Sequence, residues 1–139
     1  MIILDTNVLS ELMREEPAAS VVHWLDNQPP SSIWTTSITL MEIRFGLRSM
    51  PLGKRSVRMI QELEAVLMEE IEERYASFDI AAAEQAANLM AMRKSKGRPV
   101  EFRDTMIAGI VISRHAILAT RNTDHFSDLG SSIVNPWNS

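Results

Sequence analysis

The sequence predicts an α/β fold in which helices flank a central, mainly parallel sheet. Two short, continuously apolar runs at residues 2–4 and 116–120 are typical of strands that are buried on both faces. Longer segments between these runs have apolar residues three or four positions apart, which is the spacing of amphipathic helices. Because strands that alternate with helices form layered folds, both observations favour a parallel sheet covered by helices.

The composition indicates one folded domain that comprises residues 1–139. A chain of 139 residues is long enough for one hydrophobic core and too short for two ordinary domains. Its 23% charged and 45% hydrophobic residues are ordinary values for a globular protein. No apolar run reaches the roughly 18 residues that span a bilayer, and no signal-like segment opens the chain, so we expect no membrane contact and a cytoplasmic location. The absence of cysteine excludes disulfides, thiolate metal sites and thiol nucleophiles.

The elements of the first half follow from apolar spacing and from prolines. We expect a strand at 2–4, a helix at 7–13, a helix at 18–26, a strand at 33–36 and a helix at 38–48. Pro17 separates the first two helices, and the Pro29–Pro30 pair requires a loop before the second strand. In the third helix we expect Met41 and Phe45, together with Ile38, to face the core.

The second half begins with a long amphipathic helix at 54–73. Its apolar residues lie along one stripe, and they are Val57, Ile60, Leu63, Leu67 and Ile71. We then expect a short strand at 75–78, a helix from 79 to 96, a loop at 95–99, a helix at 104–114, a strand at 116–120 and an edge strand at 133–135. Asp79 is a suitable N-cap for the first of these helices. Ala83, Ala86, Ala87 and Met90 give the same helix a face for close packing.

Four acidic residues that lie far apart in the sequence are the candidate catalytic groups: Asp5, Glu42, Asp104 and Asp124. Asp5 and the 121–124 segment each follow a predicted buried strand, and the carboxyl ends of parallel strands lie at one edge of a sheet. Asp104 shares a helical face with Ile107 and Val111, which is the face expected to pack on the sheet. We therefore expect these acids to converge on one site.

Converging carboxylates need a cation between them. Two ionised carboxylates about 5 Å apart repel each other by roughly 3 kcal/mol at an effective dielectric constant of about 20. A divalent cation supplies the missing positive charge. Oxygen ligands without cysteine or paired histidines suit Mg²⁺ or Mn²⁺ rather than Zn²⁺.

Each acid also has a structural alternative. Asp5 and Asp124 suit the start of a helix or a turn, where aspartate caps free backbone N–H groups. Glu42 lies three residues after Thr39, which is the spacing of a capping box. Asp104 would be favoured by the positive end of its own helix dipole. Each of these roles explains one residue, whereas a shared site explains all four.

The charge distribution leaves nucleic-acid binding open. The net charge of −4 argues against a protein that coats nucleic acid, because such binding depends on positive charge. Ten of the 14 basic residues nevertheless gather in two stretches, 44–58 and 93–103, which are either basic surfaces or solvated helix faces. His23, His115 and His125 show no spacing that suggests a shared site. We interpret Trp137 as an anchor for the last strand.

Five segments together resemble one known family. They are Ile-Leu-Asp5-Thr6-Asn7-Val-Leu, residues 37–46 around Glu42, Asp104-Thr-Met-Ile-Ala108, Ala119-Thr-Arg-Asn122-Thr-Asp-His-Phe126 and the terminal Asn135-Pro-Trp137. Each segment is short, but their order and spacing are specific and extend over nearly the whole chain. In these segments the sequence resembles the PIN-domain ribonucleases, in particular the VapC and FitB type toxins of type II toxin–antitoxin pairs.

The resemblance implies an acidic core of Asp5, Glu42 and Asp104 that binds Mg²⁺, with Mn²⁺ as the alternative. It implies Asp5 and Asp104 as the direct metal ligands. Glu42 is implied either to bind the metal through water or to position the attacking water.

The fourth acidic position departs from the family pattern. The resemblance implies that some relatives have aspartate where this chain has Asn122, while others have asparagine there and an acid slightly later. Asp124 is therefore expected to be the fourth catalytic acid, with Asn122 as the alternative. Thr6 and Asn7 are expected to orient the first aspartate by hydrogen bonding.

The function that the resemblance implies is that of an endoribonuclease toxin, which hydrolyses RNA phosphodiester bonds with metal-activated water. It also implies a homodimer and a cognate antitoxin of the VapB or FitA type, which covers the active site and places a basic side chain among the carboxylates. Asn122 keeps open an alternative, a catalytically weakened PIN-like module that binds RNA or protein. A haloacid-dehalogenase-like phosphotransferase is less well supported, because its motif has a second aspartate where this chain has Asn7.

Overall fold

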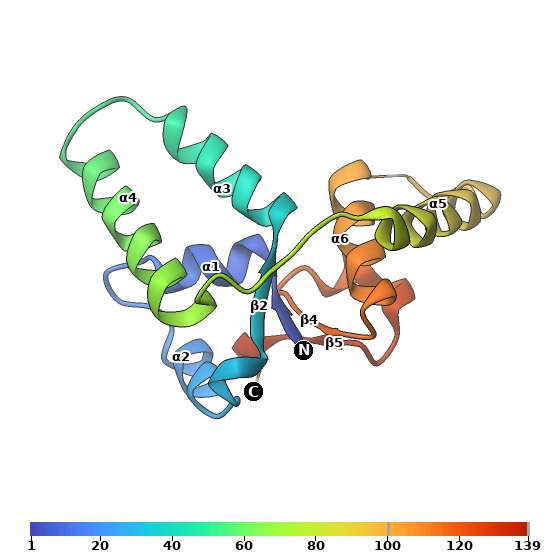
Figure 1. The fold of residues 1–139 in the computed structure, drawn as a ribbon, viewed down its shortest axis with the longest axis horizontal. Helices are drawn as coiled ribbons and strands as arrows, with labels where there is room; N and C mark the ends of the chain where they lie inside the picture. The colour runs from blue at the N-terminus through green and yellow to red at the C-terminus, as the bar shows by residue number, and fades with distance from the viewer. Residues whose placement is uncertain (100, 139) are drawn as a thin grey trace.

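A parallel sheet with helices on both sides forms the centre of the computed structural model, which describes residues 1–99 and 101–138 (Figure 1). The strands in this part of the chain are β1 (Ile2–Leu4), β2 (Ile33–Thr36), β3 (Tyr75–Ala76), β4 (Ile117–Ala119) and β5 (Ile133–Val134). The α-helices are α1 (Thr6–Leu12), α2 (Ala19–Asp26), α3 (Ser37–Arg48), α4 (Lys54–Val66), α5 (Ile80–Ser95) and α6 (Phe102–Ser113). A π-helical turn, η2 (Leu67–Ile71), and 3₁₀ segments η1 (Pro30–Ser32), η3 (Thr123–Leu129) and η4 (Pro136–Asn138) complete the elements.

The strand order is β3-β2-β1-β4-β5, and all the pairs are parallel. The register places Ile2 beside Ile33 of β2 and beside Ile117 of β4. The predicted α/β fold with a mainly parallel sheet is therefore confirmed. The chain adds β2 and β3 on one side of β1 and then β4 and β5 on the other side, so the carboxyl ends of β1 and β4 form a switch point, where open α/β sheets bind ligands. Asp5 follows β1 and Thr120 follows β4 at this point.

The two faces of the sheet carry two hydrophobic cores. Successive side chains of a strand point to opposite faces, so Leu4 lies in the core with α1, α2, α3 and α4, whereas Ile3 lies in the core with α5 and α6. In β4, Ala119 lies in the same core as Leu4, and Leu118 lies in the same core as Ile3. Figure 1 shows the helices as two groups, α1 to α4 on one side and α5 with α6 on the other. Burial from both faces explains why the central strands are continuously apolar.

The predicted boundaries agree with the structure to within two residues. The strands at 2–4 and 33–36 match in full, and Asp79 caps α5 by accepting from the backbone N–H of Ala82 at 3.0 Å. The helix expected at 104–114 begins two residues earlier, at Phe102, and the 3₁₀ segment Thr123–Leu129 was not predicted. No helix among the described residues has the length and apolar content needed to cross a bilayer.

The inward face of α3 differs from the prediction. Ile38 is buried as expected, but Met41 is 59% exposed and Phe45 is 70% exposed. The buried stripe instead includes Ile43 and Leu47, which contact the core that α1, α2 and α4 share. Ile43 and Leu47 each lie two positions after a predicted core residue, Met41 and Phe45 respectively. Two positions correspond to roughly 200° of rotation about the helix axis, so Met41 and Phe45 lie on the solvent side.

The long amphipathic helix at 54–73 is only partly buried. Leu63, Leu67 and Ile71 lie in the core, whereas Val57 is 53% exposed and Ile60 is 41% exposed. The regular helix ends at Val66 and continues through the π-helical turn. The first half of the predicted stripe therefore faces solvent.

Helix α5 packs on α6 through a face one position away from the predicted one. Its buried residues are Ala82, Ala86, Leu89 and Arg93. Ala87 is exposed, while Ala83 and Met90 are half-buried at the edges of the contact. The two helices approach each other so closely that a Cβ atom on Gly109 of α6 would lie 2.5 Å from the Ala82 carbonyl oxygen.

Candidate active site

Asp5 lies where β1 turns directly into α1. Its backbone N–H donates to the carbonyl of Ala119 in β4 at 2.9 Å. Its side chain accepts from the backbone N–H of Thr6 at 2.8 Å and so caps α1. The cap uses only Oδ1, so Oδ2 is left for other interactions. Asp5 is 3% exposed, and these interactions therefore take place in a buried site.

A buried threonine on the neighbouring strand end binds the second oxygen of Asp5. Thr120 Oγ1 donates to Asp5 Oδ2 at 2.8 Å and accepts from the backbone N–H of Asn122 at 3.0 Å. Asn7 Nδ2 also donates to Asp5 Oδ2, at 3.4 Å, while Asn7 Oδ1 accepts from the backbone N–H of Arg121 at 3.1 Å. These bonds join the end of β1, the start of α1 and the segment after β4 into one unit.

Asp104 reaches the same region from the first turn of α6. It is 3% exposed, and its Oδ1 lies 3.1 Å from Arg103 Nη2. Its Oδ2 lies 3.0 Å from Nδ1 of His125, which is part of η3. The position also lies at the positive end of the helix dipole, which favours a carboxylate.

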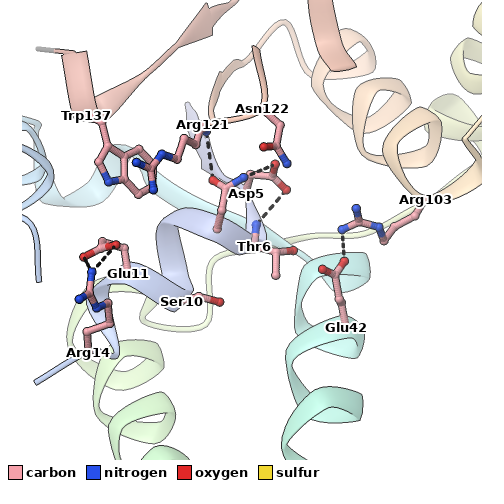
Figure 2. Close-up of a pocket in the computed structure, with 11 residues that line it drawn as sticks. Asp5, Thr6, Ser10, Glu11, Arg14, Glu42, Arg103, Arg121, Asn122 and Trp137 are labelled. Carbon is pink, nitrogen blue, oxygen red and sulfur yellow. Dashed lines mark hydrogen bonds and ion pairs between the residues drawn. The ribbon is translucent and has the colours of Figure 1, made fainter. Parts of the chain in front are cut away.

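Arg103 connects Asp104 to Glu42 of α3. Its guanidinium binds Glu42 Oε2 through Nη1 and Asp104 through Nη2, and Figure 2 shows it reaching across to the Glu42 carboxylate. Glu42 is half-buried. Thr36 caps α3 by accepting from the backbone N–H of Thr39 at 3.0 Å. The capping-box alternative for Glu42 is therefore wrong, because the helix begins earlier than that spacing assumed.

The electrostatics of Asp5 reflect its burial and its acidic neighbour. Burial raises the pKa of Asp5 above its ordinary value, and the charge of Asp104 adds to the rise. Hydrogen bonds from Thr120 and Thr6 and the charge of Arg103 oppose the rise. A cation placed between the two aspartates would favour their ionised forms and remove this penalty.

A pocket of about 440 Å³ opens beside Asp5 (Figure 2). Its lining residues are Asp5, Thr6, Asn7, Ser10, Glu11, Arg14, Glu42, Arg103, Arg121, Asn122 and Trp137. Figure 2 shows the guanidinium of Arg14 on Glu11, that of Arg103 on Glu42 and that of Arg121 beside Trp137. Asp104 lines a neighbouring cavity of about 200 Å³ together with His125.

Asn122 and Asp124, the two candidates for the fourth position, lie in different surroundings. Asn122 lines the pocket, and Figure 2 shows its side chain near that of Asp5. Asp124 is exposed in the first turn of η3 and does not line this pocket. The structure thus gathers Asp5, Glu42 and Asp104 around Arg103 and leaves Asp124 apart.

The donor set fits a hard divalent cation that keeps part of its water shell. Mg²⁺ is commonly held by one or two carboxylates with water at the remaining positions, and Asp5 and Asp104 offer two buried carboxylates whose repulsion a cation relieves. Asn122 adds a neutral amide oxygen at the pocket. Within residues 1–99 and 101–138, no three acidic or histidine side chains are close enough to form a complete ligand cluster. This arrangement suits Mg²⁺ better than Zn²⁺, which proteins usually hold with three or four side-chain ligands that include histidine or cysteine.

The sequence prediction missed three residues whose side chains contact the candidate catalytic acids, namely Thr120, Arg103 and His125. Thr120 follows a buried strand, as Asp5 does, and Arg103 directly precedes Asp104. Both positions in the sequence could therefore have identified these residues as members of the site. The spacing of the histidines gave no sign that His125 belongs to the site, but its ring contacts Asp104. The unpredicted 3₁₀ segment brings His125 to this position.

The basic stretch at 93–103 is not a uniformly solvated face. Arg93 is 3% exposed and binds both carboxylate oxygens of Asp128, at 2.8 and 2.9 Å, and Thr105 Oγ1 at 2.9 Å. These hydrogen bonds from Arg93 lower the pKa of Asp128. Arg93 thus ties α5 to η3, the segment that places His125 beside Asp104.

The sequence matches the PIN domain family over residues 2–131. The chain is 39% identical to VapC ribonuclease Y4jK of Sinorhizobium fredii over 137 residues, which cover 99% of this chain and 98% of that protein. It is also 39% identical to plasmid stability protein StbB of Pseudomonas syringae pv. tomato, with 99% of both chains covered. Its identity to the tRNA(fMet)-specific endonuclease VapC of Shigella flexneri is 30%, with 96% of both covered.

The fold is similar to those of solved toxin–antitoxin complexes. The crystal structure of FitAcB from Neisseria gonorrhoeae gives a TM-score of 0.88 at 31% identity and covers 100% of both chains. The structure of DNA-bound VapBC from Salmonella typhimurium gives a TM-score of 0.82 at 26% identity and covers 97% of both. The sequence match and the fold similarity both extend over nearly the whole chain, and the chain belongs to the PIN domain family.

Proposed function

We propose that this chain is a Mg²⁺-dependent endoribonuclease, the toxin of a toxin–antitoxin pair that acts in the cytoplasm, and that residues 1–139 form one PIN domain. The observation that carries the proposal is the pair of buried carboxylates, Asp5 and Asp104, at the carboxyl edge of a parallel sheet and beside an open pocket. Relatives that are named VapC ribonuclease and tRNA(fMet)-specific endonuclease, and that match nearly end to end, support RNA as the substrate class.

In the proposed reaction, Asp5 and Asp104 hold Mg²⁺, with Mn²⁺ as the alternative ion. The bound ion supplies positive charge to the scissile phosphate and makes a water molecule more acidic. Thr6 and Thr120 bind one oxygen each of the Asp5 carboxylate, so this ligand is oriented before any ion arrives. Glu42 lines the pocket, where it would bind the ion through water or position the attacking water. As the water oxygen bonds to phosphorus, the P–O bond to the leaving oxygen would break, the proton of the attacking water would pass to solvent, and the leaving oxygen would take up a proton from solvent.

The fourth position is tested by two substitutions. Asn122 lines the pocket and Asp124 does not, so the geometry favours Asn122 as the residue that contacts substrate or metal-bound water. We expect Asn122→Ala to reduce cleavage and Asp124→Asn to leave it nearly unchanged. The opposite order would return the fourth acidic role to Asp124.

The proposed protein partner is a cognate antitoxin of the VapB or FitA type. An apolar groove of about 400 Å³ adjoins the acidic pocket and shares Thr6, Ser10 and Glu42 with it. Phe45 lines this groove and is 70% exposed, so an apolar antitoxin segment would cover it. A basic antitoxin side chain would then bind the carboxylates that now hold Arg103.

A homodimer is the proposed assembly of the toxin itself. Light scattering on the purified chain is expected to give twice the monomer mass of 15.7 kDa. A mass of one monomer at micromolar concentration would reject this assembly without affecting the proposed chemistry.

The central test compares RNA cleavage by purified variants in Mg²⁺ and in EDTA. We expect the wild-type chain to cleave RNA only when Mg²⁺ is present. Asp5→Asn and Asp104→Asn should lower the cleavage rate roughly a hundredfold or more, because loss of a direct metal ligand should cost at least as much activity as loss of a residue that only hydrogen-bonds to a ligand. Glu84→Gln removes an exposed carboxylate on α5 and is the control with unchanged activity. Full metal-dependent cleavage by both aspartate variants would reject the assignment.

A second candidate function is a catalytically weakened PIN-like module that binds RNA or protein. It is favoured by Arg103, which already bridges Glu42 and Asp104, and by the amide of Asn122 where some relatives have an acid. A thermal melt with millimolar Mg²⁺ separates the two functions, because an ion that binds only the folded chain raises the Tm. No Tm shift together with no cleavage would favour the module.

A further inference from the structure

Arg121 and Trp137 form a stacked pair at the mouth of the acidic pocket. The guanidinium carbon of Arg121 lies 4.8 Å from the centre of the Trp137 ring, and both residues line the pocket. Figure 2 shows the guanidinium lying along the indole, on the opposite side of Asp5 from Arg103 and Glu42. The pair therefore faces the same open space as the candidate catalytic carboxylate.

The backbone on both sides fixes this pair at the sheet edge. Arg121 follows β4, and its N–H donates to Asn7 Oδ1 at 3.1 Å, within the hydrogen-bonded unit that holds Asp5. Trp137 follows β5, and its N–H donates to Asn135 Oδ1 at 3.0 Å. The two strands pair directly in the sheet. The backbone of both residues is thus held at the sheet edge that also carries Asp5.

Arg121 differs from Arg14 and Arg103, the other arginines of the pocket, because no carboxylate among the described residues pairs with it. Arg14 binds Glu11, and Arg103 binds Glu42 and Asp104. Among the described residues no carboxylate forms an ion pair with Arg121, and its side chain is exposed. An exposed guanidinium that contacts an aromatic ring and lacks an acidic partner retains its full charge for an anion.

Single-stranded RNA carries the two groups that such a pair recognises. Proteins bind unpaired nucleotides by stacking bases on aromatic rings or on arginine planes, while cationic groups bind the phosphates. We propose that Arg121 and Trp137 form a nucleotide-binding subsite in which the guanidinium binds a phosphate next to the scissile bond and the stacked surface holds the adjoining base. This inference rests on the proposed ribonuclease function and identifies the form of its substrate as an unpaired strand.

The test measures RNA binding without catalysis, in EDTA and at low ionic strength. The probes are a fluorescein-labelled decaadenylate RNA and a decamer with the same sugar-phosphate backbone but no bases. We expect Trp137→Ala to weaken decaadenylate binding about tenfold, because it removes a stacking surface, and to leave binding of the abasic decamer unchanged. Arg121→Ala should weaken binding of both probes, because both carry phosphates.

The chain contains a matched control in a second cation–π pair. Arg114 lies over the Trp34 ring, 5.9 Å from its centre, and neither residue lines the acidic pocket. Arg114→Ala should therefore leave both affinities unchanged. Trp137→Phe keeps an aromatic ring and should retain most of the decaadenylate affinity. In NMR spectra the indole N–H signal of Trp137 should shift on addition of decaadenylate, while that of Trp34 should not.

Several results would overturn the subsite. These are no binding of decaadenylate by the wild-type chain, an equal effect of Trp137→Ala on both probes, or an Arg114→Ala effect as large as that of Arg121→Ala. A failure of the ribonuclease proposal would give a different result: the chain would cleave no RNA, but Trp137 would still contribute to base-dependent binding of decaadenylate. Cleavage that is independent of Trp137, with unchanged binding, would leave the nuclease in place and remove the subsite.

Discussion

At the scale of single residues, the burial of Asp5 makes its negative charge costly when no metal is bound. Its pKa is raised in the folded chain, so the folded state holds the proton more tightly than the unfolded state. The resulting stability is fully present below the ordinary value of 3.8 and is lost as the pH rises through the raised pKa. Stability in EDTA should therefore fall as the pH increases across this range.

Asp5→Asn is expected to raise the Tm by a few degrees at pH 7 in EDTA. An amide, like the protonated acid, carries no charge, and its oxygen can accept from the Thr6 N–H. Its nitrogen can donate to the Thr120 oxygen, which reverses the present bond, at the cost of the weak 3.4 Å bond from Asn7 Nδ2. Thermal denaturation at pH 7 and near pH 3.5 measures the difference, which should nearly vanish at the lower pH. A lower Tm than the wild type at pH 7 would contradict the assumed cost of the charge.

Arg103 is expected to compete with a divalent cation for the same carboxylates. It binds Glu42 and Asp104, and its charge also acts on Asp5. Arg103→Ala should lower the Tm in EDTA, because the acids lose their counter-charge, and should tighten Mg²⁺ binding by about tenfold. Isothermal titration calorimetry of both chains checks this expectation.

Arg44→Ala is the matched control for the arginine substitution. Arg44 also bridges to a glutamate, Glu64, but it lies on a cavity lined by other residues. Its loss should leave Mg²⁺ affinity unchanged. Weaker Mg²⁺ binding by Arg103→Ala would instead mean that the guanidinium orients the ligands.

At the scale of elements, the position of Asp104 depends on how closely α6 approaches α5. Gly109 permits this approach, since an added Cβ would lie 2.5 Å from the Ala82 carbonyl oxygen and 2.9 Å from Ala86 Cβ. Gly109→Ala should destabilise the chain by about 1–3 kcal/mol, the usual range for overpacking. Urea denaturation gives the free energy of unfolding.

Gly46→Ala is the control for the glycine substitution. Gly46 lies in α3, and a Cβ there would have no atom within 4 Å apart from its chain neighbours and the nearby backbone of its own helix. Because alanine is the better helix former, this change should stabilise the chain by roughly 0.5–1 kcal/mol. Equal effects of the two substitutions would mean that α6 can move away from α5 without cost.

The sequence predicted the elements well where burial alone determines the pattern. Ile3 and Leu4 are buried from both faces, and this is visible as a continuous apolar run. The inward faces of α3 and α4 were less predictable, because Phe45 and Val57 are apolar side chains on exposed surfaces. Apolar spacing cannot distinguish a surface that packs within the chain from one that is left for a partner.

At the scale of the whole molecule, the site unites elements from both halves of the chain. Asp5 and Glu42 come from segments before residue 50, whereas Asp104 and Thr120 come from segments after residue 100. The sequence predicted that four acids converge, from strand ends for Asp5 and the 121–124 segment and from a helix face for Asp104, while the family resemblance added Glu42. The structure brings Asp5, Glu42 and Asp104 together and leaves Asp124 outside the pocket. The sequence could not predict the contact of Arg103 with Glu42 or that of His125 with Asp104, because those depend on side-chain reach across helices.

Metal binding should therefore stabilise the whole molecule rather than one segment. An ion held by Asp5 and Asp104 links the core on the α1 to α4 side to the core on the α5 and α6 side. At a Mg²⁺ concentration of about a hundred times the Kd, the free energy of unfolding should rise by about 2.7 kcal/mol. Hydrogen exchange measured by mass spectrometry should then slow in both β1 and α6. Asp104→Asn should abolish the effect, and protection confined to α1 would mean that the ion binds Asp5 without α6.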